Sequence, residues 1–169
     1  SCRLVFDLLK TAGADRIMSV DLHAAQSQGF FDGPVDHLVA MPVLVDYIRD
    51  RFQGHLDNVA VVSPDAGRIR VAEQWAQRLG GGPLAFVHKT RDITRPNQAV
   101  ANRVVGDVAG KDCVLVDDLI DTAGTIAGAC HVLQDAGAKS VTVVATHGVL
   151  SGPAIERLKN CGAREVVLT

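Results

Sequence analysis

The chain has 169 residues, enough for one ordinary domain or slightly more, and 47% of them are hydrophobic, which excludes a mainly disordered protein. Its 17 Lys and Arg residues nearly balance its 19 Asp and Glu residues, so charge supplies no general attraction to nucleic acid. No apolar run approaches the roughly 18 residues of a membrane span, and the first residues follow the pattern of an amphipathic helix rather than of a secretion signal, so we expect no membrane partner.

The first part of the chain predicts, in order, a helix, two short strands and a second helix. Pro42 begins the second helix, because the fixed φ and missing N–H of proline suit the first helical turn. The expected ranges are 1–13, 16–22, 35–40 and 42–52, with Gly13 and Gly54 ending the two helices.

From residue 58 onward, strand and helix patterns alternate regularly. The segment 59–62 is apolar at every position, as in a parallel strand that is buried on both faces. Such alternation implies right-handed βαβ units, so the predicted fold class is α/β, with a mostly parallel sheet flanked by helices. The expected strands are 58–63, 84–88, 113–117, 141–146 and 165–168, and the expected helices are 67–79, 124–136 and 153–160.

Residues 89–111 interrupt this rhythm with a long polar connection. It carries Lys89, Arg91, Arg95 and Arg103, and it has little apolar content before residue 104. Long polar connections inside compact domains are typical of functional lids, disordered segments or solvated surface excursions. All three alternatives stay open on composition alone.

The four cysteines form no CxxC pair. Cys113 and Cys130 lie within apolar stretches, so we expect them to be small buried hydrophobic side chains rather than disulfide partners or metal ligands. Free thiols of this kind favour a reducing compartment, and we expect the cytoplasm.

The strongest chemical signal is the segment 114–126. It reads as a buried strand, then the carboxylates of Asp117 and Asp118, then a short turn and the start of a helix. Ligands of open α/β sheets bind beyond the carboxyl ends of the strands. The free N–H groups and the dipole of the helix start, together with the hydroxyls of Thr122 and Thr125, predict a phosphate cradle there.

Two carboxylates beside a phosphate would repel it unless they bind something else. Neighbouring hydroxyls of a sugar, or Mg²⁺, would suit them. The alternative is that Asp121 or Thr122 caps the helix while Asp117 and Asp118 are merely solvated. Neither a GxxxxGK[ST] loop nor a GxGxxG motif occurs in the chain.

The segment 116–125, Val-Asp-Asp-Leu-Ile-Asp-Thr-Ala-Gly-Thr, resembles the phosphoribosyl-pyrophosphate (PRPP) motif of type I phosphoribosyltransferases and of ribose-phosphate pyrophosphokinases (PRPP synthetases). Further segments, in family order, favour the pyrophosphokinases: 20–31, 62–67, 88–91 and 145–152. The resemblance covers essentially the whole chain. It implies a type I phosphoribosyltransferase-like fold and Mg²⁺-dependent transfer of pyrophosphate from ATP to ribose 5-phosphate, for nucleotide biosynthesis.

The same resemblance implies roles for particular residues. His23 and Asp65 would help to hold Mg²⁺ and the phosphates of ATP. Lys89 and Arg91 would close over the transferring pyrophosphoryl group, with Arg91 also contacting ribose 5-phosphate.

The resemblance further implies that Asp117 and Asp118 meet the ribose 2- and 3-hydroxyls. The 5-phosphate would be held by the turn that follows, formed by Asp121, Thr122, Ala123, Gly124 and Thr125. Ala123 departs from the pattern, because the family usually has glycine there; its Cβ restricts positive φ, and we expect a mild effect.

The family has two similar domains, so residues 1–40 are expected to be the C-terminal remnant of a first domain and 41–169 a second domain that is incomplete at its C-terminus. Family members form homo-oligomers, hexamers built from dimers, and phosphate or ADP are possible effectors. Two alternatives remain: a type I phosphoribosyltransferase that consumes PRPP, and a non-catalytic regulatory subunit or fragment.

Overall fold

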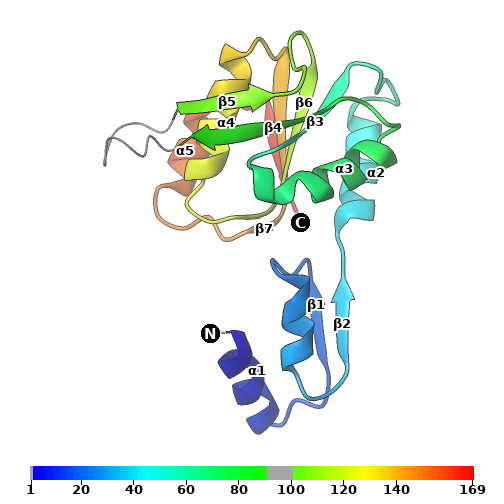
Figure 1. Cartoon of the computed structure of the whole chain (residues 1–169), viewed down its shortest axis with the longest axis vertical. Coiled ribbons are helices and arrows are strands. Elements are labelled where there is room, and N and C mark those ends of the chain that lie inside the picture. The colour runs from blue at the N-terminus through cyan, green and yellow to red at the C-terminus, as the bar shows by residue number, and fades with distance from the viewer. Residues whose placement is uncertain (1, 91–100) are drawn as a thin grey trace. The chain divides into compact units, whose positions relative to one another are not determined.

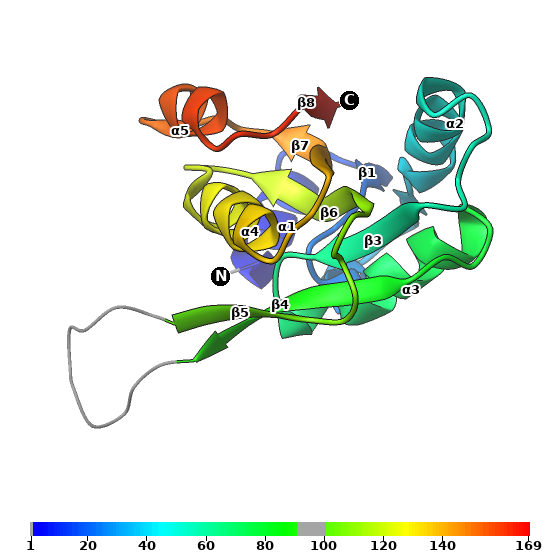
Figure 2. The ribbon, with the colours of Figure 1, turned by 90° about the horizontal axis from the view of Figure 1, so that it is seen from above.

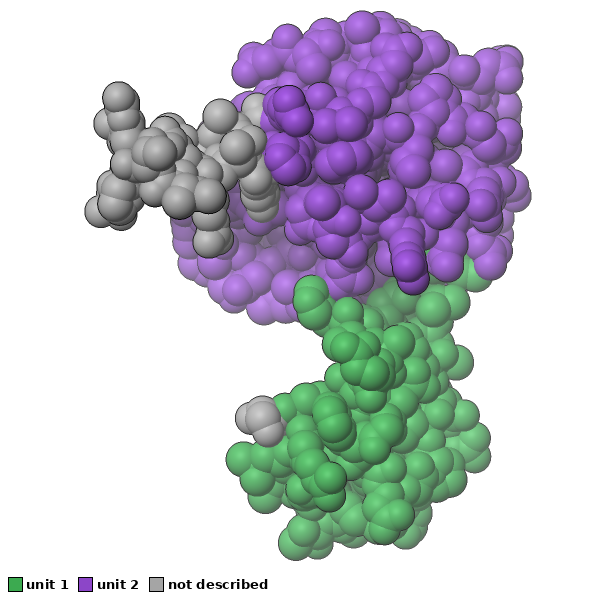
Figure 3. All heavy atoms as spheres, in the orientation of Figure 1, with its two compact units in different colours: residues 1–42 green, residues 43–169 purple. Residues whose placement is uncertain are grey.

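The computed structural model describes residues 2–90 and 101–169, except the side chains of residues 89, 90, 101 and 102 (Figure 1). The chain divides into two compact units, unit 1 at residues 1–42 and unit 2 at residues 43–169 (Figure 3). None of the helices in the described part is long and apolar enough to cross a membrane.

Unit 1 is a small α/β piece. Two parallel strands pair with Ile17 opposite Val35, and Phe6 of the first helix lies 6.2 Å from Phe31 between ring centroids. The predicted helix and both strands are confirmed, whereas the 3₁₀ helix between the strands was not predicted. The elements are α1 (Cys2–Thr11), β1 (Ile17–Val20), η1 (Ala25–Phe30) and β2 (Val35–Leu38).

Unit 2 is built on a six-stranded sheet in the order β5-β4-β3-β6-β7-β8. All neighbouring strands run parallel except β4 and β5, so the predicted mostly parallel sheet is confirmed. The strands are β3 (Val59–Ser63), β4 (Leu84–Thr90), β5 (Ala101–Val105), β6 (Asp112–Ile120), β7 (Ser140–Gly148) and β8 (Glu165–Leu168).

Helices cover both faces of this sheet. Figure 2 shows α2 and α3 on one face and α4 and α5 on the other. The chain passes from β3 outward to β4 and then returns to β6 on the other side of β3, so the connections reverse direction between β3 and β6. In open α/β sheets such a reversal opens a crevice at the carboxyl ends of the two strands. The helical segments are α2 (Met41–Arg51), η2 (Ala66–Arg68), α3 (Ile69–Arg78), α4 (Gly124–Asp135) and α5 (Ala154–Asn160).

The core lies along the central strands, where β3 is buried at every position and β6 is buried from Asp112 to Val116. Cys113 and Cys130 are fully buried within it, as expected, and so is Cys161. Burial raises the pKa of the Cys113 thiol to about 12, which keeps it protonated at neutral pH. These thiols act as small hydrophobic side chains.

The polar connection expected over 89–111 contains a strand that was not predicted, and its residues 91–100 lie outside the described part. Strand β4 continues to Thr90, and β5 returns antiparallel to it, with Phe86 opposite Val105. Gly106 then turns the chain at a φ of +113°, where a Cβ would lie 2.7 Å from the Leu84 carbonyl oxygen. Strand β5 was not predicted because it lies at the edge of the sheet, where a strand can carry polar residues. Asn102 and Arg103 therefore look like part of a loop in the sequence.

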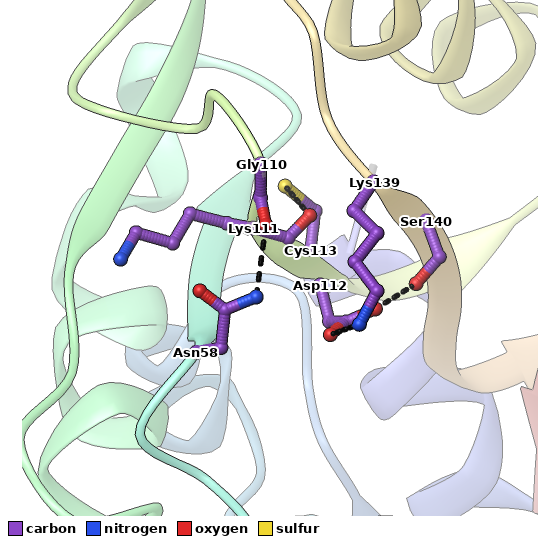
Figure 4. A network of polar contacts seen from close by, with 7 residues as sticks. All are labelled: Asn58, Gly110, Lys111, Asp112, Cys113, Lys139 and Ser140. Carbon is purple, nitrogen blue, oxygen red and sulfur yellow. Dashed lines mark hydrogen bonds and ion pairs between the residues drawn. The ribbon is translucent and has the colours of Figure 1, made fainter.

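A polar network ties together the strand starts at the end of the sheet opposite the predicted site (Figure 4). The Asp112 carboxylate accepts hydrogen bonds from Ser140 Oγ at 2.7 Å and from Lys139 Nζ at 2.9 Å. The side chain of Asn58 donates to the Gly110 carbonyl oxygen at 2.8 Å. Burial raises the pKa of Asp112, but these hydrogen bonds and the charge of Lys139 outweigh it, and the pKa lies below its ordinary value.

Replacing Asp112 by Asn should therefore lower the free energy of unfolding at pH 7 by about 1–2 kcal/mol, because a charge-assisted contact is lost. A carboxylate with a lowered pKa stabilises the fold above its unfolded pKa and loses that contribution as the pH falls through the folded value. Denaturant titrations should show the difference shrinking below about pH 4. Exposed Asp57→Asn is the control, and a difference that stays constant from pH 7 to pH 3 would contradict the prediction.

Candidate functional site

The predicted end of the strand at Asp117 was too early, because β6 stays paired with β7 as far as Ile120. Asp117 and Asp118 therefore lie within the strand. Asp117 lines a cavity with Leu119, whereas Asp118 forms an ion pair with Arg68. The backbone N–H of Asp118 donates to Asp117 Oδ1 at 2.9 Å.

The predicted phosphate turn, residues 121–125, forms the rest of this cavity. The cavity has a volume of about 150 Å³ and lies where β6 passes into α4. The cavity is lined by residues from the end of β6, the whole turn and the start of α4: Asp117, Leu119, Ile120, Asp121, Thr122, Ala123, Gly124, Thr125 and Ile126. The structure thus brings together every predicted ribose 5-phosphate residue on this segment except Asp118, which faces Arg68.

Helix α4 starts without a side-chain cap. Its N-cap residue is Ala123, in the left-handed conformation at φ +58° and ψ +11°, and it makes no side-chain capping hydrogen bond. The alternative in which Asp121 or Thr122 caps the helix is therefore wrong. The first N–H groups of a helix have no partner within the helix, which is why helix starts commonly bind anions.

Hydrogen bonds to three consecutive carbonyl groups fix the turn between β6 and α4. The carbonyl of Ile120 accepts from the N–H groups of Val149 and Leu150, and that of Asp121 accepts from Ser151 N–H at 3.0 Å. The Thr122 carbonyl accepts from Arg157 Nη1 of α5 at 2.9 Å. In a trans peptide the N–H points opposite to the C=O, so three consecutive N–H groups face away from these partners.

The carboxylates sit in an unusual electrostatic setting. Burial, reinforced by the side-chain hydrogen bond and the charge of Asp118, raises the pKa of Asp117 to about 7, while the backbone N–H of Asp118 and the charge of Arg68 oppose that rise. Arg68 and Asp118 are themselves largely covered, with side chains 17% and 11% exposed. Arg68 follows the neighbouring strand β3, so it crosses the reversal point of the sheet to reach Asp118.

Asp65 lies in the turn between β3 and η2. Its Oδ1 accepts from Gly67 N–H at 2.8 Å, and its carbonyl accepts from Ser63 Oγ at 2.6 Å. It is thus an N-cap residue of the kind that its position after Ser63-Pro64 would suggest. A carboxylate oxygen is also a donor that Mg²⁺ prefers, so this side chain fits the metal in chemistry.

His23 belongs to unit 1, in the exposed turn after β1. The turn is held by Asp21, at φ +44°, whose Oδ2 accepts from Ala40 N–H, and by His37, whose Nε2 accepts from Leu22 N–H at 2.9 Å. Imidazole is a less usual partner for Mg²⁺ than a carboxylate. Among residues 2–90 and 101–169, no group of three His, Cys, Asp or Glu side chains could hold a metal ion.

The side chains of the two predicted loop cations, Lys89 and Arg91, are not described by the structure. Lys89 is in β4, with its backbone opposite Asn102, but its side chain lies outside the described residues, and so does the whole of Arg91. Conversely, the sequence reasoning missed Arg68, Arg157 and His37. Arg68 could have been suspected, because it follows β3, the strand beside the acidic strand β6. No feature of the sequence around Arg157 distinguishes it from other residues of α5.

Replacing Asp117 by Asn should have an effect on stability that depends on pH. A buried carboxyl with a raised pKa is bound to a proton in the folded state but not in the unfolded state between about pH 4 and 7, so stability falls as the pH rises through that range. Asn removes this loss, and the variant should gain on the order of 1–3 kcal/mol relative to the parent between pH 4 and pH 8. Denaturant unfolding at pH 4 and pH 8 measures this difference in the free energy of unfolding, with exposed Asp121→Asn as the control. A difference that is the same at both pH values would contradict the raised pKa of Asp117.

Comparison with known proteins places this site in a family. The model of the phosphoribosyl transferase domain matches residues 34–167. The chain is 99% identical over 169 residues to a ribose-phosphate pyrophosphokinase from Bifidobacterium longum, a match that covers 100% of this chain and 50% of that protein. The chain spans about half the length of the curated relatives it matches.

Solved structures that are similar to this one include a synthetase and a phosphoribosyltransferase. The phosphoribosylpyrophosphate synthetase from Mycobacterium smegmatis matches with a TM-score of 0.90 and 61% identity, over 99% of this chain and 52% of that one. The orotate phosphoribosyltransferase from Aeropyrum pernix matches with a TM-score of 0.55 and 27% identity, over 75% and 70% of the two chains. These findings confirm the resemblance and the fold inferred from the motifs, and the chain belongs to the phosphoribosyl transferase domain family.

Proposed function

We propose that the intact protein transfers pyrophosphate from Mg-ATP to the 1-hydroxyl of ribose 5-phosphate, giving PRPP and AMP for nucleotide biosynthesis. Relatives at 67% and 99% identity are named ribose-phosphate pyrophosphokinases, and a solved relative at 61% identity is a phosphoribosylpyrophosphate synthetase. Because this chain corresponds to half of those proteins, the activity is proposed for the intact protein.

The observation that carries the proposal is the turn that precedes α4. The helix begins with no side-chain cap, and the three preceding carbonyls are all tied back to other segments. The three peptide N–H groups that point away from those partners can therefore donate to a compact anion in the adjacent cavity. The hydroxyls of Thr122 and Thr125 add two more donors, and the 5-phosphate of the sugar is the group that fits them.

The sugar ring would then lie toward the end of β6. Asp117 and Asp118 are acceptors for the 2- and 3-hydroxyls, and such pairs of acceptors are what neighbouring hydroxyls require. Asp118 keeps acceptor capacity beside its ion pair with Arg68, because a carboxylate has about four lone-pair sites.

In the reaction, the bond from ribose O1 to the β-phosphorus of ATP forms as the bond from that phosphorus to the α–β bridging oxygen breaks; AMP departs with that oxygen, and the proton of the 1-hydroxyl is released to solvent. Mg²⁺ bound to the phosphates would neutralise their growing charge, and Asp65, with His23, would hold it. Lys89 and Arg91 would donate to the transferring group and exclude water.

The remaining parts of the proposal rest on the family likeness. We propose that the protein works in the cytoplasm as a homo-oligomer, a hexamer, with phosphate or ADP as effectors. Residues 1–40 would be the C-terminal part of a first domain, and 41–169 most of a second. Unit 1 exposes several large apolar side chains, a surface that a more complete domain would cover: Leu4, Leu8, Met18 and Val39.

A direct assay tests the function. The intact protein is incubated with Mg²⁺, ATP and ribose 5-phosphate, and AMP and a pyrophosphorylated sugar should appear in equal amounts. Release of pyrophosphate from PRPP with a nucleobase would instead indicate a phosphoribosyltransferase. Binding of ribose 5-phosphate without AMP formation would indicate a non-catalytic homologue.

Replacing Lys89 by Ala should lower kcat by about 10²–10³-fold, the usual effect of removing one donor from a charged transition state. The Kd of ribose 5-phosphate should stay nearly unchanged, because the cation is proposed to act on the transferring group. Steady-state kinetics and calorimetry separate the two effects. Lys159→Ala, an exposed lysine on α5, is the control, and unchanged AMP release by the Lys89 variant would remove that residue from the mechanism.

A further inference from the structure

The peptide between Thr122 and Ala123 is held in an orientation that alanine disfavours. Ala123 has a φ of +58° and a ψ of +11°, the left-handed region in which Cβ crowds the backbone. The residue is 4% exposed and belongs to the core cluster of unit 2, so the surroundings impose this conformation on it.

A half-turn of this one peptide plane would relieve the strain. Rotating the plane changes φ of Ala123 from positive to an ordinary negative value while the flanking Cα atoms stay nearly in place. The same rotation would turn the Thr122 carbonyl oxygen into the cavity and carry the Ala123 N–H away from it. A carbonyl oxygen aimed at a phosphate repels it, so the relaxed orientation cannot bind the anion as the observed one can.

Arg157 makes the contact that opposes this rotation. Its Nη1 donates to the Thr122 carbonyl oxygen at 2.9 Å, a charge-assisted bond that exists only in the observed orientation. The guanidinium lies against the turn, because an atom at the Cβ position of Gly124 would be 3.4 Å from the same nitrogen. Arg157 comes from α5, well outside the motif that supplies the turn.

We propose that Arg157 is a positioning residue for the phosphate site: it locks the Thr122–Ala123 peptide so that the Ala123 N–H faces a phosphate monoester in the cavity. The inference rests on the proposed function, since it takes the 5-phosphate of the sugar as the ligand. Arg157 acts through the backbone of the turn and does not need to touch the ligand.

A double-mutant cycle tests the proposal on the intact protein, with the Kd of ribose 5-phosphate measured by calorimetry. Arg157→Leu removes the donor, and Ala123→Gly removes the strain that the donor opposes. In the alanine background, Arg157→Leu should weaken binding about tenfold, because the binding orientation becomes a minor population. In the Ala123→Gly background, the same change should weaken binding only about twofold, because glycine adopts either orientation with similar ease.

Several measurements separate this role from a general effect on folding or charge. Arg157→Lys keeps a donor and should restore part of the affinity, whereas Lys159→Gln removes a charge from the same helix and should change the Kd less than about twofold. The Kd of ATP should be unchanged in every variant. Unfolding titrations of all variants check that each is folded under the conditions of the binding assay.

Equal weakening by Arg157→Leu in both backgrounds would overturn the proposal, because it would show that the arginine acts by charge or packing. Unchanged binding in the alanine background would overturn it as well. Failure of the parent protein to bind ribose 5-phosphate would overturn the proposed function together with this inference, so the two failures are distinguishable.

Discussion

The site depends on the unequal lengths of two neighbouring parallel strands. Strand β3 stops at Ser63, and its pairing with β6 covers the stretch up to Leu115, whereas β6 continues beside β7 as far as Ile120. From Cys113 to Leu115, where β6 pairs with both β3 and β7, its residues are buried and apolar. Once β3 has ended, one edge of β6 is open, and the polar side chains of Asp117 and Asp118 follow there.

The two kinds of group that this edge presents have opposite electrostatic needs. A phosphate cradle requires donors and positive potential, whereas two carboxylates create negative potential. Asp118 pairs with Arg68, which offsets its charge, whereas Asp117 lines the cavity together with Asp121. Arg157 approaches the turn from the other side, so cations from two different elements flank the carboxylates and the turn.

Much of the architecture could be predicted from local patterns. The apolar run at 59–62 and the regular spacing of helices in unit 2 indicated a parallel sheet because burial on both faces leaves a clear signature. The acidic strand end and the turn at 121–125 could also be located, since they are contiguous in sequence. Strand β5 could not, because an edge strand needs few apolar residues, and its pairing with β4 is visible only in three dimensions.

The supporting residues were the least predictable part of the site. Arg68 and Arg157 reach it from elements that are distant in sequence from the turn, 50 residues from Asp118 and 35 from Thr122. The departure at Ala123 was visible in the sequence, and its restriction of positive φ was expected. The backbone geometry was needed to show that Ala123 is the N-cap of α4. It was also needed to show that the carbonyl before Ala123 accepts a hydrogen bond from Arg157.

The distribution of the cysteines makes the molecule convenient to study by fluorescence. Three thiols are buried in the interior of unit 2, and Cys2 lies exposed on the first helix of unit 1. Thiol-reactive dyes attack accessible thiolates, so a maleimide should modify the Cys2 position of this chain selectively, with no need to remove the others. A dye placed there would report on the environment of unit 1.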